Sequence, residues 1–454
     1  YKEIAHTKQE LETSKESLAA NYSRIERLAY HDGLTGLYNR IAFMKYTYDI
    51  LHSSSSFERH AILFIDLDNF KNVNDTLGHD YGDILLKQIA EKLSSFVDAN
   101  DILARTGGDE FLIFKSHLSK EDDLESFTKR LVTIANHPFL LDDETVYITM
   151  SVGVSFFPQN GLSINELTKN ADIAMYSAKT SGKNNYMFFN STMEDEVNRR
   201  SDLIDILRDA LDNHEVYLVY QPQADASTGK ITGFEALMRL RSSLVGQVAP
   251  DEFIPVAEEC GLIDELGEWA FTEACSFNKR LMDMGFEPIT VSVNLSTSQI
   301  RSKTLLSTIA NIPEKIGMPL KYLEIELTES VLMKNFEQNL NFINTIRDMG
   351  INIALDDFGT GYSSFNYLTK IPINTLKIDK SFVAGITNSQ KDRFIASTII
   401  TLAHQLNITV IAEGVEDIDQ LRTLQSQQCD KLQGYFFSRP ILDNDFIQLL
   451  KDNR

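Results

Sequence analysis

Residues 351–361 read INIALDDFGTG, an apolar run of strand length that ends in two adjacent aspartates and a glycine-containing loop. Comparable short apolar segments recur from Ser201 to the C-terminus, most of them separated by about 10–30 residues with helical spacing. Eight strands with intervening helices in about 255 residues predict a (β/α)₈ barrel. The eight segments are Val216–Pro222, Ile231–Leu240, Ile289–Ser296, Leu323–Thr328, Ile351–Asp357, Thr375–Phe382, Ile408–Glu413 and Leu432–Ser438.

The first two of these segments depart from the regular pattern. Only about eight residues separate them, with Gly229 in the turn, whereas a parallel crossover needs a dozen or more. We therefore expect this pair to be antiparallel and the barrel to be a modified one.

Polar residues lie within or near the ends of seven of the predicted strands. The C-terminal ends of barrel strands meet at one mouth, so these side chains are expected to converge. Carboxylates brought together there would repel, and their burial would cost free energy without a cation. Oxygen ligands with no clustered Cys or His indicate Mg²⁺ or Mn²⁺ and not zinc. The residues are Glu235, Asn294, Glu326, Asp356, Lys377, Glu413 and Gln433.

Asp357 adds a second carboxylate beside Asp356, which is enough for a site with two metal ions. Two ions about 4 Å apart suit in-line attack on a phosphodiester, because they hold both the attacking and the leaving oxygen. Lys377 would then polarise or deprotonate the attacking water. Protein kinases also carry an Asp-Phe-Gly triplet, but neither an H-R-D loop nor a G-x-G-x-x-G loop accompanies it here, which argues against a kinase.

Several motifs, in order from about Val197 to Arg454, closely resemble those of the EAL-domain phosphodiesterases. They are EAL at 235–237 with Arg239, ELTE at 326–329, DDFGTG at 356–361, LKID at 376–379, AEGVE at 412–416 and QGY at 433–435. The resemblance implies hydrolysis of cyclic di-GMP to linear pGpG with two Mg²⁺ or Mn²⁺ ions.

The same resemblance implies a role for each matching residue. The implied metal ligands are Glu235, Asn294, Glu326, Asp356 and Asp357. Lys377 matches a water-activating lysine, Glu413 a further site carboxylate and Glu329 a loop-stabilising glutamate. The implied substrate contacts are Gln221, Arg239, Asp379 and Gln433. One position departs from expectation, since Gln223 stands where an apolar residue would follow the Gln-Pro pair.

The N-terminal part, from about His31 to Phe189, also alternates between strand-like and helical patterns. We expect a strand at Ala61–Asp66 and helices at Gly82–Phe96 and Ile164–Ala178. The stretch Ile102–Lys115 reads as two β runs joined by a Gly-Gly pair, which is a hairpin signal.

Acidic residues mark both of these β regions. Asp66 and Asp68 close the first run, and Asp109 and Glu110 follow the Gly107-Gly108 turn. If the hairpin pairs beside the first strand, Asp66 and Asp109 can share a cation. Glycines at the turn would let the backbone approach a polyphosphate closely.

The wider pattern resembles the GGDEF diguanylate cyclases over about residues 29–189. The matching stretches are FIDLDNFKNVNDTLGHDYGD at 64–83, RTGGDEF at 105–111, DGLTGLYNR at 32–40 and MYSAKTSG at 175–182. The resemblance implies a palm-like α/β domain, related to nucleotidyl cyclases, that makes cyclic di-GMP from two GTP with Mg²⁺.

Residue roles in this domain also come from the resemblance. Metal would be held by Asp66, the Leu67 carbonyl and Asp109, while Glu110 would assist attack by the 3′-hydroxyl. Guanine would be read by Asn74 and Asp83, and the phosphates would face the glycine turn (Gly107, Gly108) and Lys71, Lys179 and Lys183. Lys183 is often Arg in the family, and lysine keeps the charge without bidentate contact.

A second departure concerns product inhibition. The family's inhibitory site needs an Arg-x-x-Asp that ends five residues before the GGDEF motif. The corresponding stretch here is 98–101, which ends in Asp101, and Asp98 occupies the position of the Arg. We expect weak or absent feedback inhibition.

Residues 1–28 carry an apolar row of Ile4, Leu11, Leu18 and Ile25 at heptad spacing, which indicates a coiled-coil helix that pairs with a second copy. A solvated helix docked on its own domain is the alternative. The resemblance to the GGDEF cyclases implies one GTP per domain and a reaction between two domains, so a homodimer is expected. The predicted organisation is a signalling and dimerisation helix (1–28), a GGDEF domain (29–190), a linker (191–200) and an EAL domain (201–454).

Composition limits the possible classes of protein. The 454 residues carry a net charge of −22 and are 43% hydrophobic, as in a folded protein without a basic nucleic-acid-binding face. No apolar stretch approaches the roughly 18 residues of a membrane span. The three cysteines form no C-x-x-C pair, which favours a reducing compartment. Since the chain begins at Tyr1, we expect a cytoplasmic protein or the cytosolic part of a longer, inner-membrane one.

The favoured function is bifunctional turnover of cyclic di-GMP. Net hydrolysis is favoured over synthesis, because the barrel can act within one chain whereas the cyclase needs two. In one alternative the GGDEF domain binds GTP and regulates the phosphodiesterase. In another the chain is a non-catalytic cyclic di-GMP receptor, which degenerate sites would favour, and neither motif set is degenerate. The acidic balance disfavours a nucleic-acid enzyme.

Overall fold

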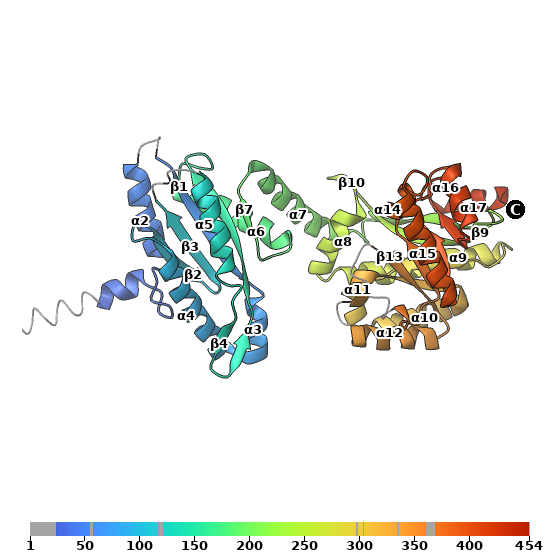
Figure 1. Ribbon diagram of the computed structural model, residues 1–454, viewed down its shortest axis with the longest axis horizontal. Helices are drawn as coiled ribbons and strands as arrows, with labels where there is room; N and C mark the ends of the chain where they lie inside the picture. Colours follow the sequence, from blue (N-terminus) through green and yellow to red (C-terminus); the bar gives the residue numbers. More distant parts are fainter. Residues whose placement is uncertain are drawn as a thin grey trace, which may run out of the picture. The chain divides into compact units, whose positions relative to one another are not determined.

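The computed structural model describes residues 24–54, 58–116, 118, 121–296, 298–302, 304–333, 336–359 and 368–453. The chain divides into two compact units, Tyr1–Arg199 and Arg200–Arg454 (Figure 1). Residues 1–23 of the expected N-terminal helix, and Thr360 and Gly361 of the DDFGTG run, lie outside the described residues. Residues 24–30 are helical.

The first unit is built on a five-stranded sheet in the order β2-β3-β1-β6-β7. Its central strand β1 is buried at all nine positions, as expected for an apolar run covered on both faces. β1 pairs antiparallel with β3 and β6, and β7 pairs parallel with β6. The strands are β1 (His60–Asp68), β2 (Ile102–Gly107), β3 (Glu110–Lys115), β6 (Thr149–Phe157) and β7 (Tyr186–Phe188), with a separate pair of β4 (Phe139–Leu141) and β5 (Glu144–Val146).

Helices cover both faces of this sheet. Alternate residues of β1 enter two different cores: Leu63 and Ile65 pack with α4 and α5, and Ile62 and Phe64 pack with α2 and α6. The predicted hairpin is confirmed as β2–β3. The helices are α2 (Arg40–Ser53), α3 (Phe70–Leu77), α4 (His79–Phe96), α5 (Glu121–Thr133) and α6 (Ile164–Thr180).

The second unit is an eight-stranded barrel, as predicted. The first strand, β8, pairs antiparallel with both β9 and β16 and so closes the barrel, whereas the other neighbouring strands are parallel. The expected antiparallel first pair is therefore confirmed. The strands are β8 (Val216–Asp225), β9 (Ile231–Ser242), β11 (Thr290–Asn294), β12 (Leu323–Thr328), β13 (Asn352–Phe358), β14 (Thr375–Ile378), β15 (Thr409–Ala412) and β16 (Lys431–Gln433); β10 (Gly246–Val248) pairs with the end of β9.

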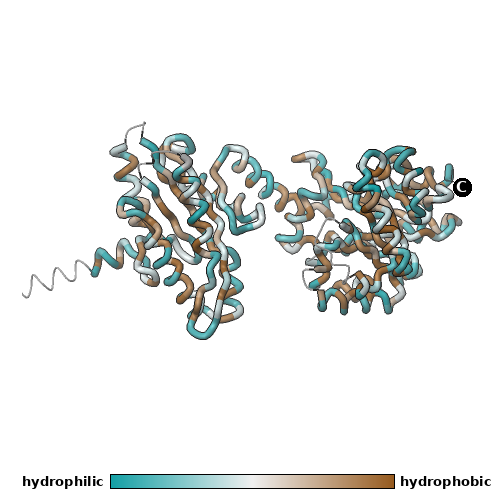
Figure 2. The backbone as a smooth tube through the Cα atoms, in the orientation of Figure 1, coloured by the Kyte–Doolittle hydropathy of each residue, from teal (hydrophilic) through white to brown (hydrophobic). Residues whose placement is uncertain are grey.

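Helices connect and surround the barrel strands. Residues 191–200, taken from the sequence as a linker, lie within a helix, α7 (Ser191–Asp209). Hydrophobic residues concentrate on the strands of each unit and on the helix faces turned toward them (Figure 2). The helices that follow α7 are α8 (Pro250–Glu259), α9 (Ile263–Asp283), α10 (Leu305–Ile316), α11 (Glu329–Met333), α12 (Phe336–Asp348), α14 (Lys380–Ala384), α15 (Gln390–Gln405), α16 (Ile418–Ser426) and α17 (Asp443–Asp452), with short 3₁₀ turns at Gln299–Arg301 and Leu320–Tyr322.

Within the described part of the chain, no helix combines the length and the apolar character that a membrane crossing requires.

An aromatic cluster packs the outside of β8 and β9 against α9 and the C-terminal helix α17. The fully buried Phe446 ring lies 5.0 Å from Phe234, 5.8 Å from Phe277 and 6.2 Å from Tyr220, measured between ring centroids. We expect Phe446→Ala to lower the free energy of unfolding of the barrel by about 3–5 kcal/mol, because it leaves a cavity in this cluster. Chemical denaturation followed by circular dichroism would measure the loss.

Phe394→Ala is the matched control, because Phe394 is 70% exposed on α15 and its removal opens no cavity. A change of less than about 0.5 kcal/mol is expected there. Equal losses in the two variants would contradict the packing role given to Phe446.

Candidate active sites

A buried lysine lies among the carboxylates of the barrel mouth. Lys377, on β14, is fully buried, and its Nζ lies 2.7 Å from Glu326 Oε2, 2.7 Å from Glu413 Oε1, 3.2 Å from Asp356 Oδ2 and 3.3 Å from Glu235 Oε2. These acids come from β9, β12, β13 and the residue after β15. One ammonium cannot neutralise four carboxylates, so the group retains a strong affinity for further cations.

The electrostatics of this cluster are uneven. Burial, with Asp356 and Glu235 nearby, raises the pKa of Glu413 to about 8, although Lys377 opposes the shift. Burial and the Glu235 charge likewise raise the pKa of Glu326 well above its usual range. Burial also acts on Glu235, but Lys377, Gln433 and Asn294 hold its pKa below the ordinary value. Lys377 and the two amides thus favour the ionised form of Glu235.

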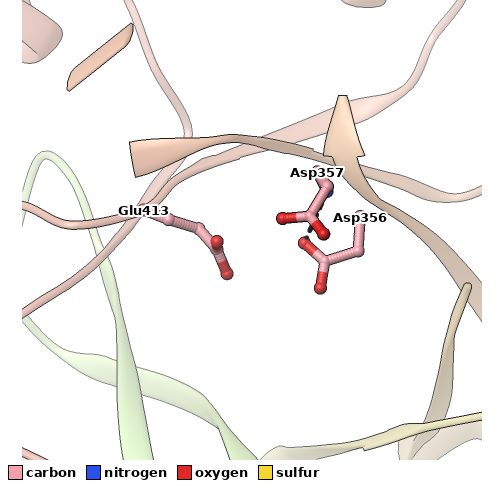
Figure 3. Close-up of side chains that lie close together, drawn as sticks. All are labelled: Asp356, Asp357 and Glu413. Atoms are coloured by element: carbon pink, nitrogen blue, oxygen red, sulfur yellow. Dashed lines mark hydrogen bonds between the residues drawn. The ribbon is translucent and has the colours of Figure 1, made fainter. Parts of the chain in front are cut away.

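Two adjacent aspartates on β13 present their carboxylates together. Neighbouring side chains of a regular strand point to opposite faces, but Asp357 has a left-handed backbone (φ 55°) and the pairing of β13 with β14 shifts register there. One carboxylate oxygen from each of Asp356, Asp357 and Glu413 consequently lies within 4.8 Å of the other two (Figure 3). Backbone strain of this kind is common at functional sites.

The residues at the mouth fit a divalent cation. Their donor atoms are hard carboxylate oxygens, which Mg²⁺ and Mn²⁺ prefer. Glu326 Oε1 is buried and has no hydrogen-bond partner among the described residues, and a bound cation would satisfy it. At the rim, Asn294 donates to Glu235 Oε1 at 2.6 Å.

The expected substrate-contacting residues line the same mouth on β8, β9 and β16. Gln433 Nε2 donates to Glu235 Oε2 at 2.7 Å and to Gln221 Oε1 at 3.1 Å. Arg239 is half-buried, and its Nη1 donates to the Met238 carbonyl at 2.8 Å. Asp379 instead caps α14 by accepting from the Ser381 backbone N–H at 3.0 Å.

Glu329 connects the start of α11 to the loop that follows β13. Its buried side chain accepts a hydrogen bond from the backbone N–H of Gly359 at 3.2 Å. A left-handed φ of 101° at Gly359, and Phe382 only 2.8 Å from where a Cβ would lie, make glycine necessary at this position.

The first unit gathers acidic residues at the end of β1. Asp66 is paired in register with Glu110 across β1 and β3, and Lys179 of α6 lies 2.6 Å from Asp66 Oδ1. Burial raises the pKa of Asp66 to about 6, with the charges of Asp109 and Glu110 adding to the shift and Lys179 opposing it. The carboxylates that the sequence analysis expected to share a cation are therefore electrostatically coupled.

An arginine holds the glycine turn between β2 and β3. Arg105 Nε and Nη2 donate to the Gly108 carbonyl at 3.0 and 2.6 Å, while Nη1 donates to Asp32 Oδ1 at 2.9 Å. Gly107 and Gly108 have positive φ, which favours glycine. Asp32 is the first residue of the DGLTGLYNR motif, and its support of this turn was not predicted from the sequence.

Family models match both units. The EAL domain model matches residues 204–440, and the model described as diguanylate cyclase, GGDEF domain, matches residues 29–185. The chain belongs to the GGDEF–EAL family. Similar proteins in Pseudomonas aeruginosa include the cyclic di-GMP phosphodiesterase NbdA, 38% identical over 421 residues, and the bifunctional diguanylate cyclase/cyclic di-GMP phosphodiesterase MucR, 37% identical over 436 residues.

The match to NbdA covers 92% of this chain and 54% of NbdA, and the match to MucR covers 95% and 64%. The chain thus spans between half and two-thirds of these relatives. A solved structure of the PaMucR phosphodiesterase in complex with cyclic di-GMP is 36% identical, with a TM-score of 0.52, and covers 54% of this chain and 99% of that one.

In the GGDEF domain, Asp68 at the end of β1 is held by hydrogen bonds from residues of other segments. Asp68 is buried and accepts from Thr149 Oγ1 at 2.6 Å, Ser151 Oγ at 2.7 Å and the Asn184 backbone N–H at 2.9 Å. Lys183, next to Asn184, donates to Asn69 Oδ1 at 2.8 Å. No role for Asp68 was foreseen from the sequence, because its donors are far away along the chain.

The residues on α3 and α4 that were expected to contact guanine and phosphate are more exposed to solvent than Asp68. Lys71 and Asp83 are exposed and Asn74 is half-buried. A Cβ on residue 82 would lie 2.0 Å from Asn74 Oδ1, so Gly82 leaves the space that the Asn74 side chain occupies.

The Asp66 carboxylate is expected to make folding of the GGDEF domain pH-dependent. Its folded pKa of about 6 exceeds the ordinary 3.8, so the folded state keeps the proton longer and stability falls as pH rises between these values. Asp66→Asn should therefore raise the free energy of unfolding by about 1–2 kcal/mol at pH 7 in EDTA, and by much less at pH 4. Denaturant titrations at both pH values measure this difference.

The exposed Asp83 offers the control, since Asp83→Asn should change stability little at either pH. The same gain for Asp66→Asn at pH 4 and pH 7 would refute a raised Asp66 pKa.

Proposed function

We propose that the EAL domain hydrolyses cyclic di-GMP to linear pGpG. The observation that carries the proposal is the convergence of Glu235, Glu326, Asp356 and Glu413 on the single buried ammonium of Lys377, with Asp357 re-aimed toward the same mouth. The names of NbdA and MucR, and the cyclic di-GMP complex of the PaMucR phosphodiesterase, agree with this substrate.

Two Mg²⁺ or Mn²⁺ ions would be held by Glu235, Asn294, Glu326, Asp356 and Asp357. Bound there, they supply an acidified water and neutralise charge on the phosphodiester. In the reaction a water oxygen bonds to phosphorus, the P–O3′ bond breaks and the 3′ oxygen takes up a proton. Lys377 orients four of the acids and donates hydrogen bonds toward the attacking water, and Glu413, 2.7 Å from Lys377, would accept or return a proton.

The polar rim would position the cyclic dinucleotide. Arg239 is partly exposed and can offer its remaining N–H groups to a phosphate. Gln221, Gln433 and Asp379 supply amide and carboxylate groups for the sugar and base. Glu329 would hold the backbone of Gly359, the residue that follows β13.

For the GGDEF domain we propose synthesis of cyclic di-GMP from two GTP by a homodimer. Asp66, the Leu67 carbonyl and Asp109 would hold Mg²⁺, and Glu110 would assist the 3′-hydroxyl. Lys71, Lys179, Lys183 and the Gly107-Gly108 turn would face the phosphates, and Asn74 and Asp83 the guanine. Ile25, the described member of the heptad row, is 65% exposed on its helix and so is available to a second copy.

A second candidate role for the GGDEF domain is regulation of the phosphodiesterase by bound GTP. The observation in its favour is that NbdA, matched across 92% of this chain, is named as a phosphodiesterase alone. A chain that only binds cyclic di-GMP is less well supported, because five acids of the barrel lie together at the mouth: Glu235, Glu326, Asp356, Asp357 and Glu413.

Product analysis separates these functions. Purified protein would be incubated with Mg²⁺ and either cyclic di-GMP or GTP, and the products separated by chromatography. We expect pGpG from cyclic di-GMP, with a rate more than about 100-fold lower in Glu235→Ala, since changes to the partners of metal ligands alone cost about 10–100-fold. Cyclic di-GMP should accumulate from GTP most visibly in Glu235→Ala and not in Asp109→Ala.

Glu287→Ala, which removes an exposed partner of Lys230, should hydrolyse cyclic di-GMP at the wild-type rate. Bound nucleotides without either product would favour the receptor. Hydrolysis that GTP accelerates, without cyclic di-GMP synthesis, would favour the regulatory role.

The cyclase should show little product inhibition. Asp98 and Asp101 both contact Lys115, at 2.5 and 2.6 Å, so two carboxylates that share one lysine stand where the family has its inhibitory Arg-x-x-Asp. With Glu235→Ala to prevent hydrolysis, added cyclic di-GMP is expected to change the rate of GTP turnover by less than about twofold, because these carboxylates do not attract a phosphate. Strong inhibition that disappears in Asp101→Ala would overturn this expectation.

A further inference from the structure

Gln223 stands at the barrel position where an apolar residue was expected from the sequence. It lies on β8, is fully buried and is paired in register with Gln433 of β16 and Gly233 of β9. Its Nε2 donates a hydrogen bond to Gln433 Oε1 at 3.0 Å. The expected apolar residue has no N–H to offer at this position.

The direction of the hydrogen bonds in this chain of amides follows from the Glu235 carboxylate. A carboxylate of an ionised glutamate only accepts, so the atom of Gln433 that lies 2.7 Å from Glu235 Oε2 must be the amino group. The second N–H of that amino group goes to Gln221 Oε1. Gln433 Oε1 therefore faces Gln223 and needs a donor there.

The hydrogen bond from Gln223 to Gln433 leaves the carbonyl oxygen of the Gln223 side chain unsatisfied. Its own Oε1 is buried and has no hydrogen-bond partner among the described residues. An unsatisfied buried carbonyl is destabilising, and such groups in folded proteins call for an explanation. Turning the Gln223 amide over would not help, because it would place one carbonyl oxygen against another.

We propose that Gln223 is a positioning residue for the phosphodiesterase site, acting through Gln433. By satisfying Gln433 Oε1 it keeps the Gln433 amino group on Glu235 and Gln221. Glu235 is then held by amide donors on both oxygens, from Asn294 and Gln433, while it faces Lys377. This inference rests on the proposed function. It assigns a supporting role to Gln223, which contacts a residue that lines the mouth.

Gln223→Met keeps the length of the side chain and removes the donor. We expect its kcat for cyclic di-GMP hydrolysis to fall about tenfold, and its affinity for Mn²⁺ to fall by a similar factor, as for other partners of metal ligands. Mn²⁺ binding would be measured calorimetrically in the full chain without nucleotide, in an Asp109→Ala background that weakens metal binding by the GGDEF domain.

Asn278→Leu is the matched control. Asn278 is also a fully buried amide that donates one hydrogen bond, to the Ile289 carbonyl at 3.0 Å, and its Oδ1 has no partner in the described part of the chain. It lies on α9 and makes no hydrogen bond to the site residues in the described structure. Thermal unfolding should show a loss of stability in both variants, with kcat and Mn²⁺ affinity within about twofold of wild type only in Asn278→Leu.

A double-mutant cycle tests whether the effect passes through Gln433. In a Gln433→Met background, adding Gln223→Met should change kcat by less than about twofold, because the bond it serves is already gone. Independent losses that multiply would overturn the proposal, as would wild-type kcat and Mn²⁺ affinity in Gln223→Met. If Gln223→Met does not fold, Gln223→Asn, whose amide falls short of Gln433, carries the same expectation.

These outcomes are separable from failure of the proposed function. If the wild-type chain does not hydrolyse cyclic di-GMP, the phosphodiesterase assignment fails, and Mn²⁺ affinity still decides whether Gln223 supports the Glu235 carboxylate.

Discussion

The EAL domain depends on one buried ammonium. Lys377 Nζ lies within 3.3 Å of carboxylates from three strands and from the residue after a fourth, at the point where these strands converge. Without a cation, burial of so many carboxylates would oppose folding of the mouth, and with one lysine the charge is only partly compensated. The same arrangement thus permits the barrel to fold and leaves it with an affinity for divalent metal.

The GGDEF domain uses a related arrangement on a different fold. Asp66 ends a buried central strand, Lys179 reaches it from α6, and the neighbouring acids raise its pKa to about 6. In both domains a buried acid is coupled to further carboxylates and paired with a lysine from another element. If each site binds metal as proposed, stability and cation binding are linked at both, since each acid gains a better partner when metal binds.

Hydrogen bonds from residues that do not face a ligand orient the residues that do. Arg105 and Asp32 brace the Gly107-Gly108 turn, Asp68 holds the backbone beside Lys183, and Gln223 orients the amide of Gln433. Each is a hydrogen bond with a definite donor and acceptor, so a substitution of similar size is not equivalent. Function at both sites is expected to depend on these supports as well as on the residues that face a ligand.

Sequence by itself determined the two domain types, the eight barrel strands and the antiparallel first pair, because motifs, apolar periodicity and loop length are local properties of the chain. The acidic residues at the strand ends were also predictable from the sequence. Only the tertiary structure decided that Lys377 would meet four of them, that a left-handed Asp357 would aim two adjacent carboxylates one way, and that Gln223 would serve Gln433 from 210 residues away. These contacts depend on strand register and barrel closure, which bring together residues that no local pattern connects.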